Sequence, residues 1–100
     1  MTPIPFDQFV SFVRTLEGEV IRTRAGNSYF AVRVLDSGLE FTPQSTRTPR
    51  RQTIAITRRV LDHFDDTKSW ITTDYRFARS ASYQLTLIDR FLAARKGQSR

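Results

Sequence analysis

Five arginines fall within one stretch of the chain that contains no acidic residue. The stretch covers residues 42–61, and its arginines are Arg47, Arg50, Arg51, Arg58 and Arg59. Guanidinium groups bind phosphate oxygens through paired hydrogen bonds, so clustered arginines favour a polyanionic ligand. A helix expected to begin at Pro49 would add the free backbone N–H groups of its first turn, which also attract anions. Nucleic acid is therefore the leading candidate partner, with DNA favoured over RNA.

The same arginines have other interpretations. Fourteen of the 16 cationic residues are arginine, a bias that a GC-rich genome alone would produce. Arg58 lies four residues before Asp62, which is the spacing of an ordinary helical ion pair on a solvated surface. The formal net charge of +6 also suits an acidic protein partner, since net charge indicates partners rather than fold.

Catalytic side chains are scarce. The chain has no cysteine and a single histidine, His63, so neither a thiolate site nor a histidine-rich metal site is expected. Asp66 and Lys68 match half of a nuclease pattern, but we interpret them as part of a turn that ends a helix. We therefore predict a protein that is not an enzyme, with no catalytic residue, no metal and no cofactor.

Length and composition indicate one domain over residues 1–100, with a flexible C-terminal tail from about residue 97. No signal peptide is visible at the start of the chain, so a cytoplasmic location is expected. Apolar runs stay well short of the roughly 20 residues that a membrane helix requires, so no membrane partner is expected.

The basic stretch must be positioned by neighbouring elements. Apolar spacings of three and four predict a helix over residues 5–16, and alternating patterns predict strands over 19–24, 28–35 and 38–42. A second helix is expected from Pro49, with Thr48 as its N-cap. Residues 70–79 are compatible with a loop or a short helix, and a last helix is expected from Ser80 or Ser82 to Gly97.

These elements predict a two-layer α+β domain in which helices cover a three-stranded antiparallel β-meander, in the order α-β-β-β-α-α. The first hairpin can pair Ile21 with Phe30 or with Val32, and both registers give the same two faces. The expected core face carries Ile21, Phe30, Val32, Val34, Leu39 and Phe41.

The opposite sheet face is a second candidate binding surface. Its cations Arg22, Arg24 and Arg33 are interleaved with Tyr29, a composition that suits phosphate contact and base stacking. The alternative is that these residues pack against one another, or that the last helix covers them.

A group of aromatic residues occurs late in the chain and consists of Trp70, Tyr75, Phe77 and Tyr83. We expect these side chains to close the core between the last two helices. If they are exposed instead, they would form a patch suited to a homodimer.

The order of the first five elements resembles the double-stranded-RNA-binding domain, in which a basic helix N-terminus contacts phosphates. The resemblance implies that place for Arg50 and Arg51, although the lysine-rich helix start and Gly-x-Gly turn of that family are absent. The layout is also similar to sheets that read the DNA major groove, such as plant AP2 domains and integrase arm-binding domains. A shared layout does not assign the chain to a family or give it a function.

Overall fold

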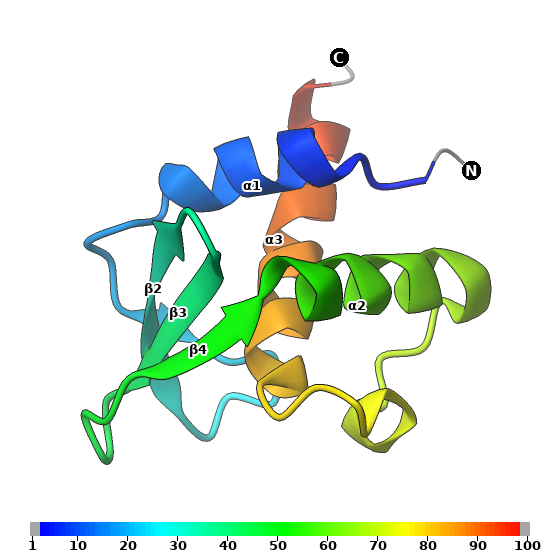
Figure 1. The fold of residues 1–100 in the computed structure, drawn as a ribbon. Coiled ribbons are helices and arrows are strands. Elements are labelled where there is room, and N and C mark those ends of the chain that lie inside the picture. Colours follow the sequence, from blue (N-terminus) through cyan, green and yellow to red (C-terminus); the bar gives the residue numbers. More distant parts are fainter. Residues whose placement is uncertain (1–2, 99–100) are drawn as a thin grey trace.

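The computed structural model describes residues 3–98 and consists of an antiparallel sheet packed against three helices (Figure 1). The elements in chain order are α1 (Phe6–Arg14), β1 (Ile21–Arg22), β2 (Tyr29–Leu35), β3 (Gly38–Pro43), β4 (Arg50–Thr53), α2 (Ile54–Thr67), the 3-10 helix η1 (Thr72–Tyr75) and α3 (Ala81–Gln98). The strands lie side by side in sequence order, as a meander. The predicted two-layer α+β architecture is confirmed, with one strand more than the sequence indicated.

The additional strand, β4, occupies the residues that we expected to begin the second helix. The prediction that Thr48 caps that helix is wrong, because the N-cap is Thr53, whose Oγ1 accepts a hydrogen bond from Ile56 N at 3.2 Å. Thr48 belongs instead to the β3–β4 turn, where its N–H donates to Thr46 Oγ1 at 3.3 Å. Pairing with β3 satisfies the backbone of β4, so the helix begins only at Ile54, the first residue of an apolar stripe that continues through Val60, Leu61 and Phe64.

Gly38 allows β4 to lie close to β3. Its φ of +147° is one that side-chain-bearing residues rarely adopt, and a Cβ at this position would collide with the carbonyl oxygen of Gln52. Gly38 is thus required both for the backbone conformation and for the close approach of β4.

The sheet register settles which of the two hairpin pairings is formed. Ile21 lies opposite Phe30, and Val32 lies opposite Phe41. The predicted core face is confirmed: Ile21, Phe30, Val32, Leu39 and Phe41 are buried and Val34 is half-buried. Period-two alternation therefore gave the correct inner face for the first three strands.

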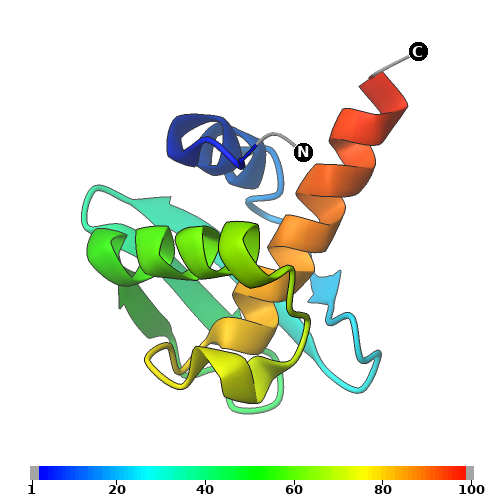
Figure 2. The same cartoon turned by 90° about the vertical axis from the view of Figure 1, so that its right-hand side faces the viewer.

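All three helices lie on this inner face; the first part of α3 lies among the other elements, and its C-terminal turns project beyond them (Figure 2). Five consecutive residues of α3, from Gln84 to Ile88, are buried, as expected for a helix surrounded on all sides. The helix continues through Gly97 to Gln98, and the rest of the expected C-terminal tail lies outside the described residues.

A buried polar cluster joins β4, α2 and α3. Gln52 Nε2 donates to Thr57 Oγ1 at 3.0 Å and also to Gln84 Oε1, while Gln84 Nε2 donates to Thr57 O at 3.0 Å. Gln52 Oε1 is the buried side-chain oxygen left without a partner within residues 3–98. The cluster explains how a strand without a single apolar residue is held against the core.

The late aromatic residues form part of the core, as predicted. Tyr75 is fully buried, and Trp70, Phe77 and Tyr83 are half-buried and pack against the core cluster. The Tyr83 ring lies 4.6 Å from that of Phe30, between centroids. Within residues 3–98, the helices are too short or too polar to cross a membrane.

Candidate functional site

The sheet surface opposite the helices is open to solvent. This outer sheet face is formed by Arg22, Tyr29, Ala31, Arg33, Glu40, Thr42 and Arg51, which alternate with the inward-facing residues. Figure 1 shows the three helices gathered on the other side of the sheet. The side chains of Arg33 and Arg51 are 64% and 75% exposed, and Tyr29 is 49% exposed. The alternative that the last helix covers this face is therefore wrong.

A row of three charged residues crosses the outer sheet face. Glu40 on β3 lies directly between Arg33 on β2 and Arg51 on β4. Its two carboxylate oxygens lie 3.6 Å from Arg33 Nη2 and 3.5 Å from Arg51 Nε. Exposed ion pairs contribute little to stability, but a shared carboxylate orients both guanidiniums while leaving one net positive charge.

Arg22 and Tyr29 form a second row on the same face. They lie opposite each other in the β1–β2 register. Arg22 Nε and Nη2 both donate to the carbonyl oxygen of Gly26, at 3.0 and 2.9 Å. This anchors the guanidinium to the hairpin turn, next to an exposed aromatic ring.

Arg47 and Arg50 lie at the β3–β4 end of the sheet, and Arg50 is in register with the inward-facing Phe41 rather than with the outer sheet face. Arg47 lies in the β3–β4 turn with a left-handed φ of 57°, and Arg50 begins β4 opposite Phe41. Both are exposed, and neither forms an ion pair within the described part of the chain. Arg50 and Arg51 thus belong to a strand, which corrects the prediction that they lie at a helix N-terminus.

Arg24 does not lie on the outer sheet face, contrary to the alternation of the sequence. Strand β1 ends at Arg22, and the chain then turns the side chain of Arg24 toward Trp70 and Asp89. Its Cζ lies 4.1 Å from the centre of the Trp70 ring, and its Nε lies 3.6 Å from Asp89 Oδ2. Arg24 is therefore removed from the predicted patch.

Arg58 and Arg59 lie on α2, away from the outer sheet face. The guanidinium carbon of Arg58 lies 4.0 Å from the ring centre of Phe6, and that of Arg59 lies 4.1 Å from the ring centre of Phe77. Among the described residues, the alternative interpretation of Arg58 as an ion pair with Asp62 is wrong, because that pair is not formed. The acid-free stretch is thus divided between two surfaces, one formed by β4 and its preceding turn and the other by α2.

A carboxylate borders the outer sheet face at the edge of β2. Strand β1 is short, so it leaves the later part of β2 unpaired on that side. Glu17, in the α1–β1 loop, accepts a hydrogen bond from Val34 N at 2.7 Å with its Oε2. The loop thereby follows the exposed edge and closes the outer sheet face on one side.

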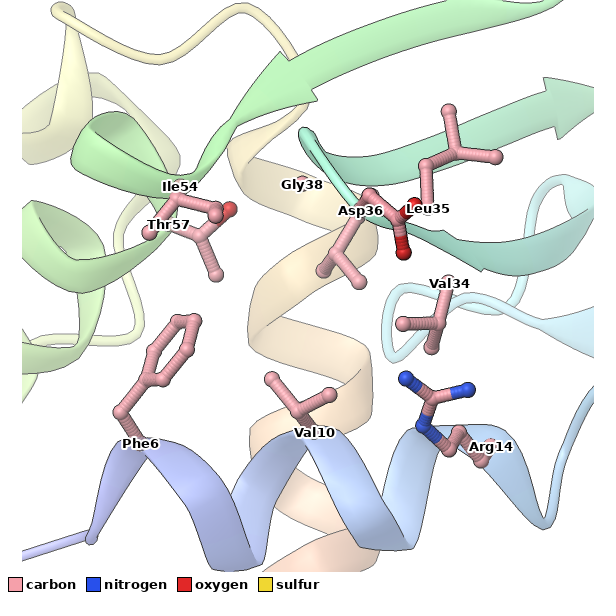
Figure 3. A pocket seen from close by; sticks show the side chains of 10 residues that line it. Phe6, Val10, Arg14, Val34, Leu35, Asp36, Gly38, Ile54 and Thr57 are labelled. Carbon is pink, nitrogen blue, oxygen red and sulfur yellow. The ribbon is translucent and has the colours of Figure 1, made fainter.

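An apolar cavity of about 210 Å³ lies on the helical side of the molecule, between α1, the β2–β3 hairpin and the start of α2 (Figure 3). Phe6, Val10, Val34 and Ile54 supply apolar walls, while Arg14 supplies a cation at one end. No ion pair or hydrogen-bonded pair of side chains is present among its described lining residues.

The histidine and the carboxylates of residues 3–98 do not form a group of three or more that could hold a metal ion. His63 is half-buried, with its ring centroid 4.8 Å from that of Tyr75. Lys68 adopts a left-handed φ of 55° as the C-cap of α2, so Asp66 and Lys68 belong to a helix-ending turn, as interpreted from the sequence.

The contribution of Arg51 to the outer sheet face was missed by sequence reasoning. One signal was present: the apolar stripe of the second helix begins at Ile54, directly after Thr53, which is a good N-cap residue.

A comparison with protein families, curated proteins and solved structures finds no match to this chain. Its function is therefore inferred from its own residues.

Proposed function

We propose that the protein is a nucleic-acid-binding module that contacts its ligand with the outer sheet face. The observation that supports this most strongly is the convergence of Arg22, Arg33 and Arg51, from three different strands, on an uncovered surface beside Tyr29. Glu40 is the one acidic residue among those that define the face, and two arginines already neutralise it.

Each part of this surface has a separate role in the proposal. The arginines bind phosphate oxygens and release counterions, which makes affinity fall steeply with salt. The Tyr29 ring supplies a platform on which a base can stack, an interaction worth about 1–3 kcal/mol per base in single-stranded complexes. Arg47, in the β3–β4 turn, extends the phosphate contacts beyond the start of β4.

Fluorescence anisotropy with labelled DNA, single-stranded and duplex, at several salt concentrations tests the proposal. Two double variants remove the same charge: Arg22→Gln with Arg33→Gln on the outer sheet face, and Arg58→Gln with Arg59→Gln on α2. The first pair is expected to weaken binding and to lower the salt slope by about 1.4 to 1.8, since each phosphate contact contributes about 0.7 to 0.9. The second pair is expected to leave the slope unchanged.

Two results would contradict the proposal. One is absence of binding by the natural protein at low salt; the other is equal loss of affinity in both double variants, which would indicate a general charge effect. Polyglutamate serves as a competitor in the same assay. If it displaced the probe as well as unlabelled DNA does, an acidic protein would replace nucleic acid as the partner.

A further inference from the structure

A cleft separate from the outer sheet face lies between the β1–β2 hairpin and the region where η1 and α3 begin. Its volume is about 410 Å³, and its lining includes Arg24, Asn27, Trp70, Thr72 and Ser82. Polar and aromatic groups dominate this lining. It therefore differs from the apolar cavity beside α1, and it suits a ligand that is both flat and polar.

The wall of the cleft contains a stack of one guanidinium on one indole. Arg24 Cζ lies 4.1 Å from the centre of the Trp70 ring. Asp89 holds the Arg24 side chain through its Nε at 3.6 Å, and the backbone N–H of Arg24 donates to Thr86 Oγ1 at 3.0 Å. Phe64 contacts the indole edge-on, with centroids 4.7 Å apart. Contacts to Arg24 and to Trp70 therefore hold both members of the stack in place without a ligand.

The Arg24 side chain remains 38% exposed although it covers Trp70. A guanidinium is planar, so when one of its faces covers a ring, its other face can accept a second flat group. Nucleobases that leave the helical stack are commonly held on such arginine planes as well as on aromatic rings.

Unused hydrogen-bonding groups surround the stack. The hydroxyls of Thr72 and Ser82 and the amide Nδ2 of Asn27 have no hydrogen-bond partner within residues 3–98, while Asn27 Oδ1 accepts from Thr23. A hydroxyl can donate and accept, and an amide nitrogen donates. These groups can therefore satisfy the polar edge of a base that lies against Arg24.

One hairpin carries both this cleft and part of the outer sheet face. Arg22 and Tyr29 project to the outer sheet face from β1 and β2, whereas Arg24 and Asn27, in the segment between those strands, line the cleft. A nucleic-acid strand that crosses the hairpin can contact both. We infer that the cleft binds a single unstacked nucleobase, stacked on the free face of Arg24 whose other face covers Trp70, and this inference rests on the proposed function of the outer sheet face.

Trp70 is the only tryptophan of the protein, so its fluorescence reports directly on the cleft. Oligodeoxythymidine is titrated while Trp70 emission and the anisotropy of a label on the DNA are recorded together. Both signals are expected to change with the same midpoint. An abasic oligonucleotide of equal length, which keeps the phosphates, is expected to bind without changing Trp70 emission.

Arg24→Lys is the matching variant, because it keeps the positive charge beside Asp89 and removes the planar stack. It is expected to weaken binding of oligodeoxythymidine at least about fivefold while leaving the salt slope unchanged. Arg90→Lys, at an exposed position on α3, is the control and should have no effect. A double variant, Thr72→Val with Ser82→Ala, leaves the stack intact and should lower affinity for oligodeoxythymidine but not for the abasic strand.

The outcomes separate the two proposals. Binding with the salt dependence expected of the outer sheet face, but with no Trp70 response and no effect of Arg24→Lys or of the double variant, would overturn the base-binding cleft alone. An equal Trp70 response to the abasic strand would also overturn it, since phosphate would then suffice. Absence of any binding would overturn the outer-face proposal and the cleft together.

Discussion

The two faces of the sheet differ sharply, although their residues alternate along the same strands. Phe30 is completely buried against the helices, while its neighbour Tyr29 is 49% exposed on the other side. The inner face is apolar over β1 to β3, whereas the outer sheet face carries arginines from three strands. Stability and the proposed binding are thus assigned to opposite sides of one layer, so substitutions can separate them.

The largest effect is expected from the inner face. Phe30→Ala removes a ring that is 0% exposed and that contacts Phe41 and Tyr83, so it should lower the free energy of unfolding by about 3–5 kcal/mol. Urea denaturation followed by Trp70 fluorescence measures this loss. A loss smaller than that of Tyr29→Ala would show that the two faces have been assigned the wrong way round.

Gly38 affects both faces at once, because it allows β4 to place Gln52 inside and Arg51 outside. Gly38→Ala should cost about 1–3 kcal/mol through backbone strain and collision with β4, and it should also weaken DNA binding. Gly97→Ala is the matched control, since a Cβ there meets no atom within 4 Å. If a destabilised Gly38→Ala protein kept normal DNA affinity, β4 would not be part of the binding surface.

The ionisation of Tyr75, on the helical side of the sheet, should make the free energy of unfolding depend on pH. Burial raises the pKa of the Tyr75 phenol above its ordinary value of 10.0. Above about pH 10 the unfolded chain loses this proton before the folded protein does, so stability should fall as pH rises, by at most about 1.4 kcal/mol per pH unit. Tyr75→Phe should remove this contribution, and should cost about 1 kcal/mol at neutral pH through the lost hydrogen bond to Ser69 O. Denaturation at pH 8 and above pH 10 compares the two proteins; an unchanged pH slope in Tyr75→Phe would contradict the assignment.

The smallest change in stability is expected from Tyr29→Ala, about 0.5 kcal/mol or less, because the ring is half exposed on an open surface. Its affinity for single-stranded DNA should nevertheless fall measurably, and Tyr29→Phe should retain most of it, since stacking needs the ring rather than the hydroxyl. If Tyr29→Ala unfolded the protein at neutral pH, the outer sheet face would have a structural role instead.

Local patterns in the sequence were sufficient for the first three strands. Alternation placed Phe30 inward and Tyr29 outward, and turn residues fixed the hairpins closely enough to limit the register to two choices. The α+β architecture follows from these strands, because an apolar sheet face requires covering helices.

Long-range contacts explain what the sequence did not indicate. The inward residue of β4 is Gln52, whose partners Thr57 and Gln84 come from two later helices, so no apolar pattern marks the strand. Arg24 was placed on the outer sheet face by extending the alternation beyond the end of β1, whereas Trp70 determines its actual position. Arg58 and Arg59 lie within the second helix, as the sequence indicated, but the rings beneath them come from distant segments.

The hydrogen bond between Glu17 and Val34 has a consequence for how the protein behaves at high concentration. An exposed strand edge is a template on which another chain can add a strand and begin to aggregate. Here the backbone N–H of Val34 is already occupied by the Glu17 carboxylate, so an incoming strand would have to displace a charge-assisted bond. Growth of the sheet through the β2 edge is therefore opposed at Val34 by one loop carboxylate.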